Sequence, residues 1–140
     1  MTLQTNVDLL LHNTFRVSAL AESFIRLSSL DQLHETTSLE PRHTLVLGGG
    51  ANVLFTKNFD GLVVKNEIKG IKKIDEDNES VTLEVGAGEN WHDFVMYSVK
   101  NGWSGIENLA LIPGTVGAAP VQNLAAYGQN FGDVCVSVTG

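Results

Sequence analysis

The sequence of 140 residues predicts a mixed fold that contains both strands and helices. Two observations carry this prediction. Apolar and polar residues alternate in several short segments, most cleanly at 79–85, as expected of half-buried strands. A longer segment at 91–101 instead has helical periodicity. The length and ordinary composition, with 43% hydrophobic residues, suit one small globular domain with a core.

Charge and cysteine content exclude several classes of protein. The formal net charge is -7, which makes nucleic acid and anionic membranes poor partners. Residues 1–11 lack the basic start of a signal peptide, and no apolar run reaches the roughly 18 residues of a membrane span. The one cysteine, Cys135, cannot form an internal disulfide, which fits a reducing cytoplasm. Its apolar neighbours predict a buried, unreactive thiol.

The first half of the chain predicts strands with one short helix. We expect an extended segment at 12–17, a strand at 22–27 and a helix at 29–35, with Ser29 as its N-cap and Pro41 ending this region. The continuous apolar run 44–47 is typical of a buried strand.

The middle of the chain predicts a further strand and a hairpin. The strand is expected at 61–65, and segments 69–77 and 79–85 are expected to pair. The acidic cluster at 75–78 would form the solvated turn. It lacks the ligand spacing of a calcium loop.

The helix at 91–101 has signals at both ends. Asn90 is a good N-cap and Gly102 suits the position after the C-cap. We expect a buried face made of Trp91, Phe94, Val95 and Val99. His92 lies off that face, and no second ligand has metal-site spacing with it, so no metal site is predicted.

The final segment 134–138 alternates like a strand. Since the chain stops at Gly140, directly after this strand, we expect it to be a fragment of a longer protein.

A glycine-rich turn follows the apolar run 44–47. Gly48-Gly49-Gly50 free the backbone, so that successive N–H groups can form an anion-binding nest, to which Asn52 adds an amide. No acidic residue lies between Thr44 and Asn58. The phosphate-binding P-loop and the dinucleotide-binding glycine pattern are both absent. The alternative is a tight turn that only connects two strands.

The segment 108–128 has no charged residue and is rich in Gly and Ala. Small residues allow close approach to a flat ligand, and Pro113 and Pro120 stiffen the loop. Gln122, Asn123 and Tyr127 offer polar groups that can orient a ligand. The alternative is a connector that merely packs.

Several motifs together resemble the UDP-N-acetylenolpyruvoylglucosamine reductase family (UDP-N-acetylmuramate dehydrogenases) of bacterial peptidoglycan synthesis. Their order and spacing match that family from about Asn13 to the end. The motifs are Asn-Thr-Phe at 13–15, Leu-Gly-Gly-Gly-Ala-Asn-Val-Leu at 47–54, Gly-Ala-Gly-Glu-Asn-Trp at 86–91 and the long segment 105–123.

The resemblance implies an α+β fold, namely a two-lobed FAD-binding domain of the vanillyl-alcohol-oxidase type with FAD bound between its lobes. The first lobe would span 1–105, and 106–140 would begin a second, truncated lobe. The substrate-binding domain would be absent.

The resemblance also implies the cofactor-binding residues. The turn would hold the FAD pyrophosphate, and the later segment would lie along the flavin and its ribityl and phosphate chain, with Tyr127 facing the same site. They are Gly48, Gly49, Gly50, Ala51, Asn52, Val53, Leu54, Ile112, Pro113, Gly114, Thr115, Gly117, Ala118, Ala119, Val121, Gln122, Asn123 and Tyr127.

Two residues depart from the family pattern. Ala51 replaces a common serine and removes one possible hydroxyl contact to phosphate. Ala125 stands where glycine is common, so it would be strained if that position needs a positive φ.

The implied parent enzyme is an oxidoreductase that uses NADPH to convert UDP-N-acetylenolpyruvoylglucosamine to UDP-N-acetylmuramate in the cytoplasm. It would serve cell-wall biogenesis, cell shape and cell division. The family's catalytic serine, arginine and glutamate would follow Gly140, so no catalytic residue is assigned here and the fragment is expected to be inactive. The alternatives are another flavin oxidase or dehydrogenase of this fold, or a non-catalytic module that binds a sugar nucleotide or a protein.

Overall fold

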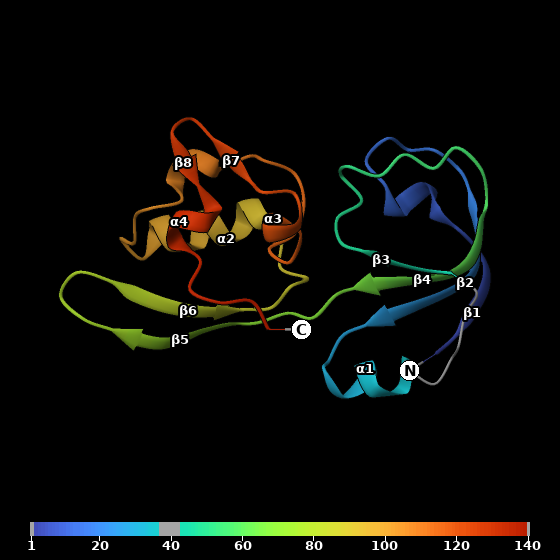
Figure 1. The fold of residues 1–140 in the computed structure, drawn as a ribbon, viewed down its shortest axis with the longest axis horizontal. Helices are drawn as coiled ribbons and strands as arrows, with labels where there is room; N and C mark the ends of the chain where they lie inside the picture. The colour runs from blue at the N-terminus through green and yellow to red at the C-terminus, as the bar shows by residue number, and fades with distance from the viewer. Residues whose placement is uncertain (1, 37–42, 140) are drawn as a thin grey trace. The chain divides into compact units, whose positions relative to one another are not determined.

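A computed structural model describes residues 2–36 and 43–139 of the chain (Figure 1). These residues form two compact units, 1–69 and 70–140, and each is described by itself. The predicted lobe boundary at 105/106 is a different division from this one and stays a prediction. Pro41, predicted to end the first helical region, lies outside the described residues.

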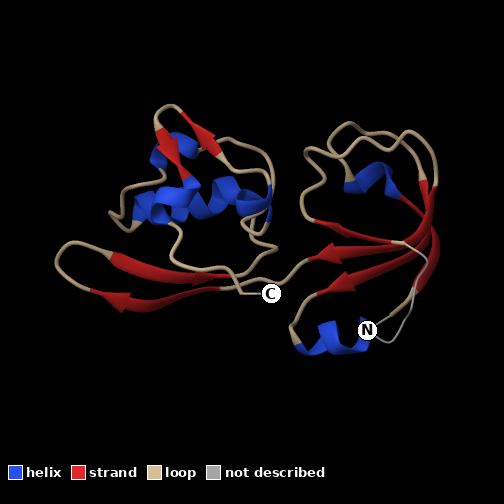
Figure 2. Cartoon of the chain, viewed as in Figure 1, coloured by secondary structure: helices blue, strands red, loops and turns tan. Residues whose placement is uncertain are grey.

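The first unit is built on a four-stranded mixed sheet (Figure 2). Its strands are β1 (Gln4–Asp8), β2 (Leu20–Leu27), β3 (Thr44–Leu47) and β4 (Phe59–Asn66). The spatial order is β1-β2-β4-β3, with β1 antiparallel to β2 and the other two pairs parallel. A 3-10 helix, η1 (Leu9–His12), follows β1, and helix α1 (Asp31–Thr36) follows β2.

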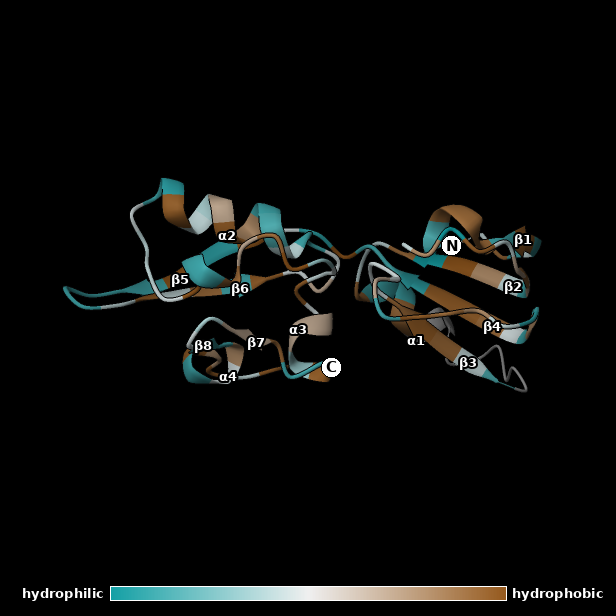
Figure 3. Ribbon diagram, turned by 90° about the horizontal axis from the view of Figure 1, so that it is seen from above, coloured by the Kyte–Doolittle hydropathy of each residue, from teal (hydrophilic) through white to brown (hydrophobic). Residues whose placement is uncertain are grey.

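Both faces of this sheet are covered by apolar side chains. Leu62, Val63 and Val64 are consecutive and all buried in β4, as expected of a central strand covered on both faces. One face packs around Phe24 and Leu47, and the other around Ile25 and Leu27. Figure 3 colours the hydrophobic residues of β2, β3 and β4 brown.

The strand predictions at 22–27, 44–47 and 61–65 are confirmed in position. The prediction that 44–47 is buried is wrong for part of its length, because β3 is an edge strand and Val46 is 65% exposed. An edge strand keeps only one sheet neighbour, so its outer side chains meet solvent.

Two predictions near the start of the chain are wrong in detail. Segment 12–17 is not extended, because His12 ends η1 and Arg16 has a left-handed φ of 56°. The first helix begins at Asp31, so the residue that precedes it is Leu30 and not the predicted N-cap Ser29.

The second unit begins with the predicted hairpin. Strands β5 (Ile71–Glu76) and β6 (Val81–Val85) pair antiparallel. The Asp77 carboxylate accepts hydrogen bonds from the backbone N–H groups of Glu79 and Ser80, and these bonds lower its pKa. The turn therefore lies at 77–80 and satisfies its own backbone, whereas Asp75 and Glu76 of the predicted turn 75–78 still belong to β5.

Helix α2 (Trp91–Lys100) is the longest helix of this unit. The Asn90 side chain accepts from Asp93 N–H, and Gly102 follows the helix with a φ of 77°, so both predicted ends are confirmed. Val99, predicted to be buried, is 45% exposed, and Ser98 is buried in its place. At 100° per residue, position 98 lies closer than 99 to the direction of Trp91.

Short elements complete the unit around α2. They are η3 (Glu107–Leu109), α3 (Ala118–Val121), β7 (Ala125–Ala126), β8 (Gln129–Asn130) and α4 (Phe131–Val134). Trp91 is fully buried among Val95, Leu109 and Leu124, and its indole N–H donates to the Leu109 carbonyl at 2.8 Å.

The strand predicted at 134–138 is wrong. Val134 ends α4, and 135–139 form no strand within the described part of the chain. Val136 is 83% exposed, and Cys135 is only half-buried, against the prediction of a buried thiol. An alternating sequence makes a strand only where another strand supplies its hydrogen bonds.

Trp91→Phe should lower the free energy of unfolding by about 2 kcal/mol, because it leaves a buried carbonyl without its donor and opens space in the core. Urea unfolding followed by far-UV circular dichroism measures this change. The half-buried Trp103 is the matched control, and Trp103→Phe should cost well under half as much. Equal losses for the two variants would contradict the central place of Trp91.

Candidate functional site

The glycine turn 48–51 directly follows β3 in the first unit. Within the described residues, the backbone N–H groups of Gly48, Gly49, Gly50 and Ala51 donate no hydrogen bond to the protein. Unpaired N–H groups need water or a ligand as acceptor. The turn therefore keeps four donors in a segment without acidic residues, which fits an anion such as a pyrophosphate.

Gly50 is required by a close approach of two backbones. Its φ is 67°, and a Cβ placed there would lie 2.1 Å from the His12 carbonyl oxygen. Any side chain at this position would collide with backbone that cannot move aside. This close approach holds the turn against the loop that follows η1.

That loop contains the Asn-Thr-Phe motif of the sequence. The buried Asn13 amide donates to the carbonyls of Leu9 and Val17 and accepts from Val17 N–H. Thr14 N–H in turn donates to the Gly50 carbonyl at 3.1 Å, and the Thr14 hydroxyl lies 3.2 Å from the Ala51 carbonyl. The motif therefore shapes a loop that supports the glycine turn.

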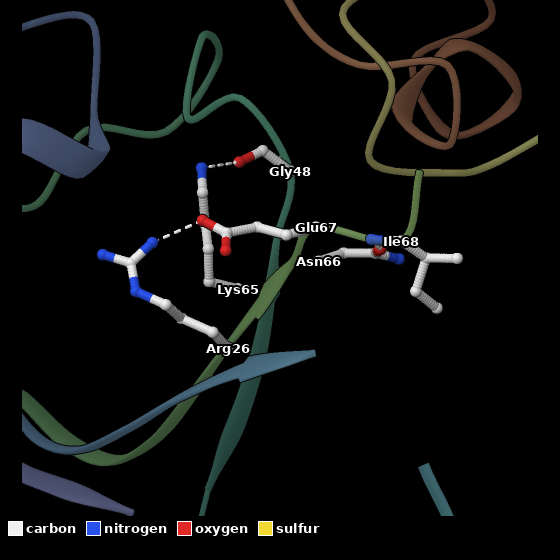
Figure 4. A network of polar contacts seen from close by, with 6 residues as sticks. All are labelled: Arg26, Gly48, Lys65, Asn66, Glu67 and Ile68. Atoms are coloured by element: carbon white, nitrogen blue, oxygen red, sulfur yellow. Dashed lines mark hydrogen bonds and ion pairs between the residues drawn. The ribbon is translucent and has the colours of Figure 1, made fainter. Parts of the chain in front are cut away.

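Lys65 supports the same turn from β4. Parallel pairing places Lys65 opposite Leu47, the residue before Gly48, and its ammonium donates to the Gly48 carbonyl (Figure 4). Burial lowers the pKa of Lys65, and Glu67 opposes this shift. Glu67 pairs with Arg26, whose guanidinium also lies 5.5 Å from the centre of the Phe24 ring.

In the second unit, two predicted motifs form one substructure. Trp91 N–H donates to the Gly114 carbonyl. The N–H groups of Val116 and Gly117 donate to the backbone carbonyls of Glu89 and Ala87, respectively. A Cβ on Gly117 would lie 2.6 Å from the Ala87 side chain. The segment 86–91 therefore acts as a template that fixes the backbone of 114–117.

Three residues after α2 have left-handed backbones that are uncommon without glycine. Leu111, Asn123 and Tyr127 have φ values of 64°, 48° and 52°. Leu111 is 79% and Tyr127 is 84% exposed, so burial of these side chains does not explain the strain. Such strained, exposed positions cluster at ligand sites in many proteins.

His92 fixes one of these positions. Its Nδ1 accepts a hydrogen bond from Leu111 N–H at 3.2 Å. The prediction that His92 lies off the buried face agrees with its partial exposure. The groups of three or more metal-ligating side chains that a metal site needs are absent from residues 2–36 and 43–139.

The predicted site residues of the second unit differ in what they present. Thr115 and Ala119 are buried, so they contribute backbone and packing, whereas Val121 and Tyr127 are exposed. The side-chain nitrogen of Gln122 lies close to Gly114, 3.6 Å from where a Cβ on that glycine would be. Ala125 has no positive φ, so the strain considered for it is absent.

Sequence reasoning missed Lys65 and Thr14 as supports of the turn. Thr14 belongs to the Asn-Thr-Phe motif at 13–15, which already indicated that this position matters. The signal for Lys65 was weaker: a lysine at the end of an otherwise apolar strand.

A family model described as an FAD binding domain matches residues 22–140. The chain belongs to the FAD-binding-domain family. Its α+β content agrees with the fold that the resemblance implied.

Curated relatives agree with the resemblance in name. The chain is 50% identical to a UDP-N-acetylenolpyruvoylglucosamine reductase of Amoebophilus asiaticus, over 99% of this chain and 42% of that protein. It is 50% identical to the enzyme of that name from Neisseria gonorrhoeae, over 94% of this chain and 39% of that protein. The chain thus spans less than half of the length of these relatives.

A solved structure agrees as well. The crystal structure of UDP-N-acetylenolpyruvylglucosamine reductase from Thermus caldophilus covers 92% of this chain with a TM-score of 0.69 and 25% identity. The match covers 46% of that chain. The resemblance stated from the sequence is confirmed.

Gly117→Ala should lower the free energy of unfolding by about 2 kcal/mol, because its Cβ would overlap Ala87. Urea unfolding of the single variant and of the double variant with Ala87→Gly measures it. The double variant should recover part of the loss by removing the colliding methyl group. Gly132→Ala is the control, since its Cβ would make only ordinary contacts.

His12 should make the first unit less stable at acidic pH. Burial lowers its pKa from 6.5, and the charges of Arg26 and Lys65 lower it further while Glu67 opposes them. Below pH 6.5 the unfolded chain binds a proton that the folded unit resists, so stability falls as the pH drops through this range.

The measurement is urea unfolding between pH 7.5 and pH 5, followed by the NMR amide signals of β2 and β4. His12→Phe should flatten the pH dependence while keeping the ring that lies 4.8 Å from Phe24. His43→Gln, at an exposed histidine of the same unit, should leave the dependence in place. An unchanged profile in His12→Phe would contradict the prediction.

Proposed function

We propose that this chain is the FAD-binding part of an NADPH-dependent UDP-N-acetylenolpyruvoylglucosamine reductase. The reaction gives UDP-N-acetylmuramate for peptidoglycan synthesis, and with it cell-wall growth, cell shape and division. The names of the relatives support this proposal. The single structural observation behind it is the set of four backbone donors at 48–51 that are unpaired within the described residues. Two of them, the N–H groups of Gly49 and Ala51, belong to peptides whose carbonyls are held by Lys65 and Thr14.

The first unit would bind the pyrophosphate of FAD. Gly48, Gly49, Gly50 and Ala51 would donate through the backbone, and Asn52 would add its side-chain amide. Val53 and Leu54 continue the segment. A pyrophosphate suits this turn because it accepts several hydrogen bonds and meets no acidic residue between Thr44 and Asn58.

The second unit would contact the flavin and its ribityl chain. The segment 112–119 offers small residues with a fixed backbone, and Val121, Gln122, Asn123 and Tyr127 follow it. The exposure of Val121 and Tyr127 and the strained backbones of Asn123 and Tyr127 support this role. FAD, when bound, supplies hydride transfer between NADPH and the UDP-sugar.

The remaining assignments concern partners and location. We place NADPH and the UDP-sugar as partners of the whole enzyme, and neither nucleic acid nor membrane as a partner. Among residues 2–36 and 43–139, no helix is long and apolar enough to cross a membrane. A cytoplasmic location is supported by the single cysteine, which has no internal partner for a disulfide.

FAD binding is tested by mixing the purified chain with FAD, desalting it and recording the visible flavin absorbance. The expected result is retained flavin. A protein that retains none would contradict FAD binding by this chain. Substrate-dependent NADPH oxidation by the longer protein that contains the chain separates the reductase from other flavin enzymes of this fold.

The location of the pyrophosphate is tested by Asn52→Asp. The variant is nearly isosteric and places a negative charge in the turn, so FAD affinity should fall by about tenfold or more, or at least about 1.4 kcal/mol. Asn58→Asp is the matched control outside the turn, because an aspartate can still accept from Leu20 N–H as Asn58 does. Equal FAD affinities for both variants would contradict the placement of the pyrophosphate at this turn.

A further inference from the structure

We propose that Lys65 is a positioning residue for cofactor binding, which orients a peptide group of the glycine turn so that its N–H can meet the pyrophosphate. This inference rests on the proposed function. Lys65 would act through the backbone of Gly48 and Gly49 and would not itself touch the ligand.

The first step is the geometry of a peptide unit. The described chain has no cis peptide bond, so the carbonyl of Gly48 and the N–H of Gly49 point in opposite directions. Lys65 donates to that carbonyl from β4. The Gly49 N–H therefore points away from Lys65, and fixing one end of the peptide fixes the other.

The second step is that glycine alone would not hold this direction. Gly48 and Gly49 lack a Cβ, and their peptide can rotate among several states at little cost. A turn that must bind an anion through its N–H groups gains affinity when the groups are already aligned. An ammonium group is a strong donor for this purpose, because charged hydrogen bonds exceed neutral ones.

The third step is that the neighbouring peptide is held in another way. The Gly50 carbonyl accepts from Thr14 N–H at 3.1 Å, which sets the direction of Ala51 N–H. Among the described residues, the Gly48 carbonyl has only Lys65 as a donor. The backbone of the 12–14 loop thus holds one peptide, and a side chain holds the other.

The fourth step concerns why Lys65 serves the turn and does not pair with an acid. Glu67 is the nearby carboxylate, and it is engaged by Arg26 (Figure 4). Glu67 N–H also donates to the Leu27 carbonyl, which fixes its backbone beside β2. The Lys65 ammonium is left to donate to Gly48, in a partly buried position where hydration is reduced.

The test compares FAD binding by three variants of the chain with that of the unaltered protein. Lys65→Met keeps the length of the side chain without its donor, and FAD affinity should fall about tenfold. Lys65→Arg keeps a cationic donor and should recover most of the loss. Lys57→Met removes an equal charge from an exposed site close in sequence to the turn and should change affinity less than about twofold.

A second readout separates positioning from stability. In a titration with inorganic pyrophosphate, the NMR amide signal of Gly49 should shift in the unaltered protein and in Lys65→Arg, and hardly at all in Lys65→Met. The Ala51 amide should still respond in Lys65→Met, since Thr14 holds the Gly50 carbonyl. Circular dichroism confirms that each variant is folded.

The outcomes distinguish this inference from the proposed function. Failure of the unaltered protein to bind FAD would overturn the proposed function and this inference with it. Binding by the unaltered protein with no loss in Lys65→Met would overturn the inference alone. Equal losses in Lys65→Met and Lys57→Met would assign the effect to net charge and would overturn it as well.

Discussion

The first unit depends on one close contact between backbones, in which Gly50 lies against the carbonyl of His12. The supports on one side of the turn are arranged around it. The side-chain amide of the buried Asn13 shapes the loop after η1, which presents the His12 carbonyl to Gly50. The next residue, Thr14, then donates its N–H to the Gly50 carbonyl. Because these contacts use carbonyl groups of the turn, its N–H groups are left for another partner.

The second unit applies the same principle with different residues. Gly117 lies against Ala87, and three backbone hydrogen bonds fix the segment 114–117 alongside 86–91. The fully buried Trp91 anchors the start of α2 directly beside these hydrogen bonds. In both units, a glycine is required by a close contact within the protein, with the His12 backbone in the first unit and with Ala87 in the second. A glycine in a family motif can therefore be required by the packing that supports a ligand site, and not only by contact with the ligand.

The sequence allowed much of this structure to be predicted because periodicity and capping are local. Strands β2 and β4, the β5–β6 hairpin and both ends of α2 follow from patterns within a few residues. The strand expected at 134–138 failed because pairing is not local, and the burial of β3 was overestimated because the sheet edge is a property of topology. The glycine turn was visible as a motif. Lys65 was not, since its role depends on the parallel register that places it beside Gly48.

The strand order β1-β2-β4-β3 has a consequence for synthesis of the chain. In the described residues, β3 has only β4 as a sheet neighbour, yet β4 follows it in sequence by more than ten residues. As the nascent chain leaves the ribosome, β1 and β2 can form their antiparallel pair at once, whereas β3 has no strand to pair with until β4 has been synthesised. The contact between Lys65 and the glycine turn cannot form until β4 has been synthesised and lies between β2 and β3.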